Sequence, residues 1–468
     1  MNLINNKSLY SFIFPLLILL AYYFFHLLML VPFWPFDPDT LSKIRFIENQ
    51  SLINMNNHHL MRWGSYLPIK IISIIWGIDF ISLTLTSFFF FVLSSTVFLY
   101  IAHRFFGLLY SLIFLTFWLT SKSLSLEIFS LSVVNQSLLP LATILLALIH
   151  LKNNQKSTFS IFLLSLAIFW AYGVKETNLF FFPLLFLLKI FKENPLIIFK
   201  ILLFGLILYF LETIVLYFFS DQYFIFGRII ALITSETGHI NEMLIGYGSE
   251  HFSSLSKFES YFLPSYRWYS ARDWDTTIFY LSFIISIFYL FNSSIKNQII
   301  HINSVLIISF FTFTTFFIVS FSPLVMGQPL ATRFLTVLLP FSFIIIISFL
   351  QHIINSSSNK HITIILLCVV LITFFSRPMY SLVRLNENWG YLSLISHYGY
   401  SSWDRNQDYK KLAEKINSYD CMIINSSNPF VKNIAEVSDL FINKKLDISN
   451  WQFDNFIFKK NRDIKCIN

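Results

Sequence analysis

The sequence predicts an all-α membrane protein that crosses the bilayer many times. Of its 468 residues, 56% are hydrophobic and only 12% are charged, whereas average soluble domains carry roughly 25% charged residues. Long apolar stretches recur along the chain, and Lys and Arg gather in the short connections between alternate stretches. So few polar side chains cannot cover so large an apolar core in water. This composition excludes soluble multidomain, disordered and disulfide-scaffold proteins.

The number of spans follows from the length of these stretches, because a helix needs about 20 mostly apolar residues to cross a bilayer. The first stretch lacks a small-residue cleavage site and is longer than a signal-peptide core, so we expect it to be retained. Glycine is scarce, at 12 residues, which disfavours the Gly-broken helices of many transporters. We predict eleven spans, at residues 10–31, 80–101, 105–121, 129–150, 158–174, 177–191, 198–219, 276–292, 299–321, 332–350 and 361–376.

The distribution of cations predicts the orientation, since cytoplasmic loops of membrane proteins are rich in Lys and Arg. A cytoplasmic N-terminus and an odd number of spans place the C-terminus outside. We therefore expect a multi-pass protein of the bacterial plasma (inner) membrane, and the sorted cations explain the net charge of +8 better than a nucleic-acid surface does. In this orientation the inner loops carry one acid, Glu193, against Lys7, Arg104, Lys152, Lys156, Lys189, Lys192, Lys200, Lys296 and Lys360.

Two regions follow from this pattern: a transmembrane region at 1–376 and an extracytoplasmic region at 377–468. The transmembrane region has two long outer loops, at 32–79 and 220–275. The inner loops are short, so any aqueous chemistry is expected on the outer face.

The tail after residue 376 has the pattern of a small α/β domain. An amphipathic helix is predicted at 408–418 and short strands at 421–425 and 453–458. Cys421 and Cys466 would lie in an oxidising compartment. They could form a disulfide or remain two free thiols.

The first outer loop holds two acids, Asp37 and Asp39, directly after the first span. A carboxylate at the membrane surface could act as a general base on a hydroxyl or an amine. Alternatively, the FDPD sequence is a proline-set turn whose acids cap a helix beginning near Leu41; one acid could cap while the other acts. Arg62 could bind a phosphate with two hydrogen bonds, or its side chain could extend along the lipid interface.

This loop, with an early acid, an amphipathic helix and the H-x-x-R-x-G motif of His59–Gly64, resembles the GT-C glycosyltransferase superfamily. More narrowly, it resembles the family 39 and protein-mannosyltransferase-like branch, which includes the aminoarabinose transferases. The matching segments keep their order across residues 10–350. They are AYGVKETNLFFF at 171–182, ETIVLYFFSDQYFIFGR at 212–228 and TRFLTVLLP at 332–340.

The chain also departs from the family pattern. The family usually shows Asp-Glu, or Asp followed by Tyr four residues later, whereas here the acids are Asp37-Pro-Asp39 and position 43 is Lys. The choice between the acids stays open, although Asp39 lies directly before the predicted helix. The Gly-Asp pair of the family is altered to Ser220-Asp221.

The resemblance implies a GT-C type fold of about 11 transmembrane helices, with interfacial helices in the first outer loop. It also implies transfer of a sugar from a polyprenyl-phosphate donor to a lipid, glycan or protein acceptor on the extracytoplasmic face. The reaction would be an inverting single displacement with Asp39 or Asp37 as the base. The expected ligands of the donor phosphate are Arg62, Lys175, Arg333 and His59, and the weaker candidates for a substrate loop are Arg228, Arg267 and Glu176.

Several of these residues have a plainer interpretation. Lys175 and Glu176 could form an ion pair at a helix end, and Trp268 and Trp274 fit an interfacial aromatic belt. Glu212 lies inside an apolar span, where it is costly unless paired. No cofactor is firmly predicted; a divalent metal could bind the loop residues His239, Glu242, Glu250 and His251, but no spacing fixes such a site.

Three other classes of protein remain in competition. A lipid-linked glycan polymerase or ligase would rely on Arg or His clusters in its outer loops. A transporter or flippase would carry ionisable residues in the middle of several spans. A scaffold that has lost activity is compatible with the altered acid motif. The expected partners are the polyprenyl-phosphate sugar, its acceptor and the bilayer, with no nucleic acid.

Overall fold

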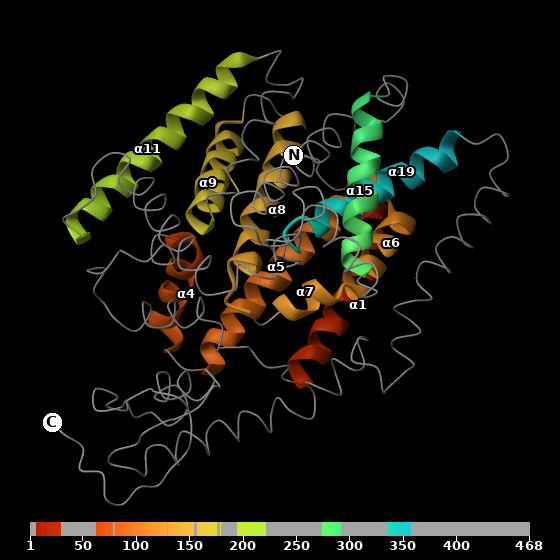
Figure 1. The fold of residues 1–468 in the computed structure, drawn as a ribbon, viewed down its shortest axis with the longest axis horizontal. Helices are drawn as coiled ribbons and strands as arrows, with labels where there is room; N and C mark the ends of the chain where they lie inside the picture. The colour runs from red at the N-terminus through yellow and green to blue at the C-terminus, as the bar shows by residue number, and fades with distance from the viewer. Residues whose placement is uncertain are drawn as a thin grey trace, which may run out of the picture.

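The computed structural model describes residues 6–29, 62–77, 80–128, 130–153, 157–175, 178, 194–220, 274–291 and 336–356. Within these ranges the chain forms helices and short turns, and no strand (Figure 1). The helices are α1 (Asn6–Met29), α4 (Trp63–Trp76), α5 (Phe80–Phe106), α6 (Leu108–Thr120), α7 (Lys122–Glu127), α8 (Val133–Asn153), α9 (Thr158–Val174), α11 (Pro195–Ser220), α15 (Trp274–Phe291) and α19 (Leu339–Ser356).

Many of the predicted spans coincide with these helices. Eight of them overlap a described helix. These spans, with their helices, are 10–31 (α1), 80–101 (α5), 105–121 (α6), 129–150 (α8), 158–174 (α9), 198–219 (α11), 276–292 (α15) and 332–350 (α19). The predicted spans at 299–321 and 361–376 lie outside the described residues, as does 177–191 apart from Asn178. The C-terminal region 377–468 also lies outside them.

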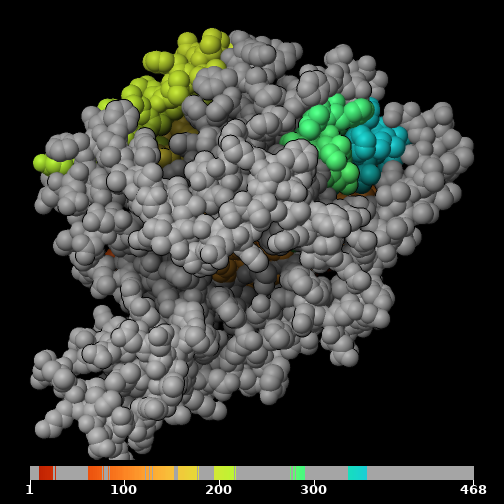
Figure 2. Space-filling view, in the orientation of Figure 1, coloured from red at the N-terminus to blue at the C-terminus, as the bar shows by residue number. Residues whose placement is uncertain are grey.

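Three of the described helices contain segments long and apolar enough to cross a membrane. They are Leu85–Phe106 in α5, Val133–Leu151 in α8 and Pro195–Val215 in α11. The helix α11 lies at the edge of the molecule, outside α9, and exposes large apolar side chains such as Phe199 and Phe210 (Figures 1 and 2). Burying such a surface in lipid is favourable, whereas exposing it to water is not. These features are those of a helical membrane protein.

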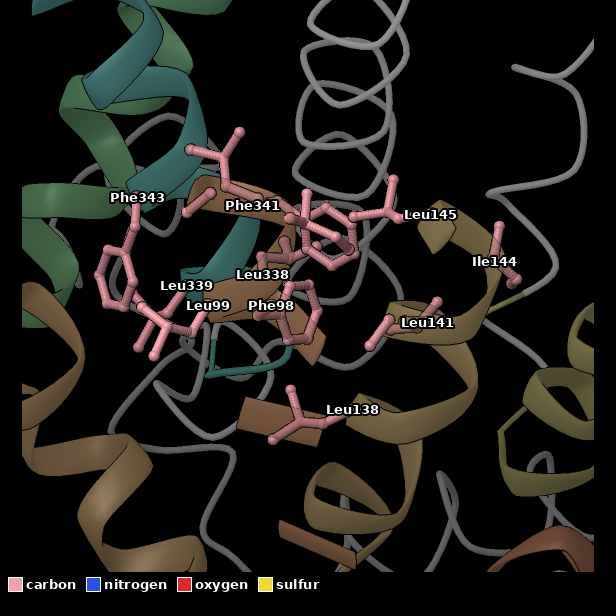
Figure 3. Close-up of a cluster of buried hydrophobic side chains, with 14 of the residues drawn as sticks. Phe98, Leu99, Leu138, Leu141, Ile144, Leu145, Leu338, Leu339, Phe341 and Phe343 are labelled. Carbon is pink, nitrogen blue, oxygen red and sulfur yellow. The ribbon is translucent and has the colours of Figure 1, made fainter. Parts of the chain in front are cut away.

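The centre of the bundle is formed by α5, which packs against α1, α4, α6, α8 and α19. Beyond it, α9 lies between α8 and α11. Side chains from α5, α8 and the start of α19 meet in a buried apolar cluster (Figure 3). In it, the rings of Phe98 and Phe341 contact edge to face with centroids 5.5 Å apart. The Phe117 ring of α6 stacks on Phe343 at 5.5 Å.

The helix α5 runs antiparallel to α1 and to α6, as contacts near the helix ends show. Near the start of α1, Ser11 Oγ lies 3.1 Å from Nε2 of His103 at the end of α5. His103 Nδ1 in turn lies 3.3 Å from Ser111 Oγ in the first turn of α6. Near the other end of α1, Tyr22 lies 3.1 Å from Ser125 of α7, oxygen to oxygen. Gly107 makes the sharp turn between α5 and α6 with φ +84°, a conformation that favours glycine.

Candidate functional site

The structure brings two of the predicted phosphate ligands to one place. Arg62 directly precedes α4, and Lys175 directly follows α9. Between them, Gly64 and Gly173 bring the two helices into backbone contact: a Cβ built on Gly64 would lie 2.5 Å from the Gly173 carbonyl carbon and 2.5 Å from the Val174 nitrogen. The H-x-x-R-x-G segment and the AYGVKET segment, far apart in the sequence, therefore meet in space.

Two tryptophans complete this helix crossing. Trp170 Nε1 donates a hydrogen bond to the Gly64 carbonyl at 3.0 Å. The Trp63 ring lies over Gly173, where a Cβ would be 2.5 Å from Cζ2, and it also contacts the Phe169 ring at 5.1 Å between centroids. The close approach of α4 and α9 therefore requires glycine at both positions. Any larger residue at 64 would clash with the backbone of α9, and any larger residue at 173 would clash with the Trp63 indole.

A third element reaches this crossing through Glu212 of α11. Trp63 Nε1 donates a hydrogen bond to Glu212 Oε1, and the Glu212 side chain is 9% exposed. A carboxylate inside an apolar helix is costly without hydrogen bonds, so this contact explains how α11 accommodates an acid. We call the group Arg62, Trp63, Gly64, Trp170, Gly173, Lys175 and Glu212 the α4–α9–α11 junction.

Arg62 is held firmly at the start of α4. Its side chain is 7% exposed. Its carbonyl oxygen accepts hydrogen bonds from the Ser65 nitrogen at 2.9 Å and the Ser65 hydroxyl at 2.7 Å. A guanidinium buried in protein interacts with an anion more strongly than one in water, because the surrounding dielectric constant is lower. The burial of Arg62 within the protein is therefore suited to anion binding.

Lys175 is anchored by its backbone and is half-buried. Its N–H donates to the Ala171 carbonyl at 3.1 Å, and its own carbonyl accepts from the Asn178 N–H at 3.0 Å. The Asn178 side chain donates to the Ala171 carbonyl at 2.9 Å and to the Ser137 hydroxyl of α8 at 3.0 Å. Asn178 was not among the residues singled out from the sequence. The feature that could have indicated its role is its position, two residues after the Lys-Glu pair and at the start of an apolar stretch.

Three carboxylates in the described part of the chain accept hydrogen bonds from side chains or backbone of the helices and their connections. Glu212 accepts from Trp63, and Glu127 accepts from the Ser132 hydroxyl. Asp275, at the start of α15, accepts from the Ser123 backbone N–H at 2.7 Å and so caps α7. The Glu212 and Asp275 bonds tie different helices together, a role the sequence did not reveal because the partners are distant along the chain.

The remaining candidates lie outside the described residues. They include both candidate bases, so the choice between them stays a prediction. Within the described ranges, no three His, Cys, Asp or Glu side chains group closely enough to hold a metal ion. The candidates outside these ranges are Asp37, Asp39, His59, Glu176, Arg228, Arg267 and Arg333, the metal candidates His239, Glu242, Glu250 and His251, and the cysteines Cys421 and Cys466.

Comparison with known proteins gives no match: no protein-family model fits the chain, and no curated protein or solved structure is similar to it. The class of the protein therefore rests on its own structure. That structure is a helical membrane protein in which Arg62 and Lys175 are brought to one junction of three helices.

Proposed function

We propose that the protein is a membrane glycosyltransferase that takes a sugar from a polyprenyl-phosphate donor on the extracytoplasmic face. The observation that carries the proposal is the convergence of Arg62 and Lys175 at the α4–α9–α11 junction. A phosphate leaving group needs positive charge, and two cationic residues whose backbones are held at one helix crossing can supply it. The cation distribution of the loops predicts that this end of the bundle faces outward.

The apolar face of α4 suits a lipid-linked donor. Leu67, Ile71, Ile74 and Ile75 are exposed on this helix, at spacings that place them on one side, and the stripe begins about one turn after Arg62. A polyprenyl phosphate has a charged head and a hydrocarbon tail, so it matches a cation beside an apolar helix face. Nucleotide sugars are made in the cytosol and their charge prevents crossing of the bilayer, which favours a flipped lipid-linked donor.

The reaction would proceed by a single displacement at the anomeric carbon. The acceptor oxygen or nitrogen attacks that carbon from the face opposite the phosphate, and its proton passes to Asp39 or Asp37. The bond from the anomeric carbon to the phosphate oxygen breaks, and the electron pair leaves with the phosphate. Arg62 and Lys175 stabilise this charge, while the carboxylate base typically contributes about 10²–10⁴ in rate.

A transfer assay tests the proposal. The purified full-length protein in liposomes is offered a panel of radiolabelled polyprenyl-phosphate sugars with lipid, glycan and peptide acceptors. Transfer of label with release of polyprenyl phosphate is expected from at least one donor, and Arg62→Ala should abolish most of it. A folded protein that extends glycans only from pyrophosphate-linked donors would be a polymerase or ligase. One that moves the lipid across the bilayer without transfer would be a flippase, and either result contradicts the proposal.

A further inference from the structure

The two halves of α11 attach to the bundle in different ways. In the first half, Ile197 and Ile201 are buried, the Phe204 ring contacts Phe162 of α9 at 5.7 Å, and the Ser165 hydroxyl donates to the Ile201 carbonyl at 3.4 Å. In the second half, Phe210, Leu211 and Ile214 are exposed, and Glu212 among them is buried. The second half of α11 therefore contacts the bundle through a buried polar side chain, that of Glu212.

The partner of Glu212 is the residue next to Arg62. Trp63 is held on one side by Gly173 and Phe169 and at its indole nitrogen by the Glu212 carboxylate. Two kinds of interaction therefore fix the position of this indole ring: its apolar contacts with α9 and its hydrogen bond to Glu212. Because the Trp63 ring packs directly on Gly173, a different ring position changes how the start of α4, with Arg62, packs against the end of α9. Gly173, under the ring, lies two residues before Lys175.

We infer that Glu212 is a positioning residue that acts through Trp63 to hold Arg62 beside Lys175. The inference rests on the proposed function, since it assigns Glu212 a role at the proposed phosphate site. Without the carboxylate, the partly buried indole N–H loses this acceptor, which favours a different ring position. The start of α4 is then held less firmly against the end of α9, and the sugar donor binds less tightly.

Three variants separate the hydrogen bond from its surroundings. Glu212→Gln keeps an oxygen that accepts from the indole, Glu212→Leu removes it, and Trp63→Phe keeps an aromatic ring over Gly173 without the N–H. We expect Glu212→Leu and Trp63→Phe each to raise the KM for the polyprenyl-phosphate sugar and to lower kcat, with a combined loss of about 10-fold in kcat/KM, because Arg62 both binds the phosphate and stabilises its charge as it leaves. Glu212→Gln should stay near wild type. The double variant should be no worse than either single one, since both remove the same interaction.

A matched control comes from a second tryptophan, Trp118, which is buried. Trp118 Nε1 donates to the Tyr23 hydroxyl at 2.9 Å in the core formed by α1, α5 and α6. Trp118→Phe removes an indole hydrogen bond of the same kind, so it reports the general cost of such a loss. Its KM for the sugar donor should remain at the wild-type value. An equal rise in KM in Trp118→Phe, or a Glu212→Gln variant as weak as Glu212→Leu, would overturn the positioning role.

Hydrogen exchange distinguishes a failure of this inference from a failure of the proposed function. We expect Glu212→Leu to speed amide exchange in residues 62–66 and 171–175, whereas Glu212→Gln and Trp118→Phe leave these segments unchanged. If the wild-type protein transfers no sugar but exchange changes in this way, the glycosyltransferase proposal fails and Glu212 still positions Arg62. Unchanged exchange at both segments in Glu212→Leu contradicts the positioning role, whatever the protein does.

Discussion

Gly64 of α4 and Gly173 of α9 meet with no room for a side chain on either residue. A Cβ on Gly64 would lie 2.5 Å from two backbone atoms of α9, and a Cβ on Gly173 would lie 2.5 Å from the Trp63 ring. Small residues allow such backbone contact between helices in membranes. Because Arg62 and Lys175 each lie two residues from one of these glycines, the contact sets how near the two cations can come to each other.

The first prediction concerns this contact. Gly64→Ala should destabilise the protein by about 1–3 kcal/mol, because the new methyl group meets backbone that cannot move aside without separating the helices. Thermal unfolding in detergent, followed by circular dichroism, measures the effect. Gly205→Ala is the matched control: it lies inside α11, and a Cβ there meets nothing within 4 Å. That variant should be neutral or slightly more stable, since alanine favours helix more than glycine does. Equal stability of the two variants would contradict the close contact.

The second prediction concerns the charge of Arg62. Arg62→Lys should weaken binding of polyprenyl phosphate, and Arg62→Ala should weaken it further, by about 10-fold or more, since lysine keeps the charge but loses the two-pronged geometry. Binding of the lipid to purified protein in nanodiscs measures this. Arg104→Ala provides the control, because Arg104 is an exposed residue of the same type near the end of α5. A loss as large in Arg104→Ala would indicate attraction by net charge rather than a site.

The third prediction concerns the candidate bases. Replacing the base by asparagine should reduce kcat by about 10²–10⁴, since the acceptor then loses its proton acceptor. We expect this result for Asp39→Asn, with Asp37→Asn as the alternative. Initial rates of sugar transfer at saturating sugar donor give kcat for each variant. Full activity in both single variants would contradict the mechanism, while insertion in the membrane and unaltered lipid binding confirm that each variant folds.

The fourth prediction concerns the aromatic core. Phe343→Ala should cost about 3–5 kcal/mol, because Phe343 is fully buried and packs against Phe114, Phe117 and Trp118. Phe89→Ala is the control on α5, where the ring is 54% exposed. Unfolding of both variants in the same detergent compares them. A smaller loss for Phe343→Ala than for Phe89→Ala would show that the buried cluster does not stabilise the bundle.

Sequence reasoning located the described helices well where an apolar stretch is bounded by polar residues. The span predicted at 158–174 coincides with α9 (Thr158–Val174), because Ser157 caps its start through the Ser160 N–H and Lys175 ends it. The span predicted at 332–350 overlaps α19, and its first residues, 332–335, lie outside the described ranges. The helix α19 begins at Leu339, with Pro340 in its first turn, where the missing N–H removes no helical bond. Within the described residues just before it, Val337 and Leu338 form a turn.

The junction itself could be predicted only in part. The motifs around Arg62, Lys175 and Glu212 were singled out, but no pattern along the chain indicates that they share one location. The helix α4 lies in the first outer loop, where the resemblance implies interfacial helices, but its bounds were not predicted, since 14 residues of helix span only about 21 Å, less than a bilayer core. The hydrogen bonds Trp63–Glu212 and Ser123–Asp275 join residues about 150 positions apart, and only the tertiary packing reveals such pairs.

A density map of the purified full-length protein with bound polyprenyl phosphate shows whether Arg62 and Lys175 hold the donor phosphate. We expect a phosphate within hydrogen-bond distance of the Arg62 guanidinium and the Lys175 ammonium, with the lipid tail along the exposed face of α4. The map would also show whether Asp39 or Asp37 faces the site. A lipid phosphate bound elsewhere, with Arg62 and Lys175 contacting only protein, would mean that the α4–α9–α11 junction is not the donor site.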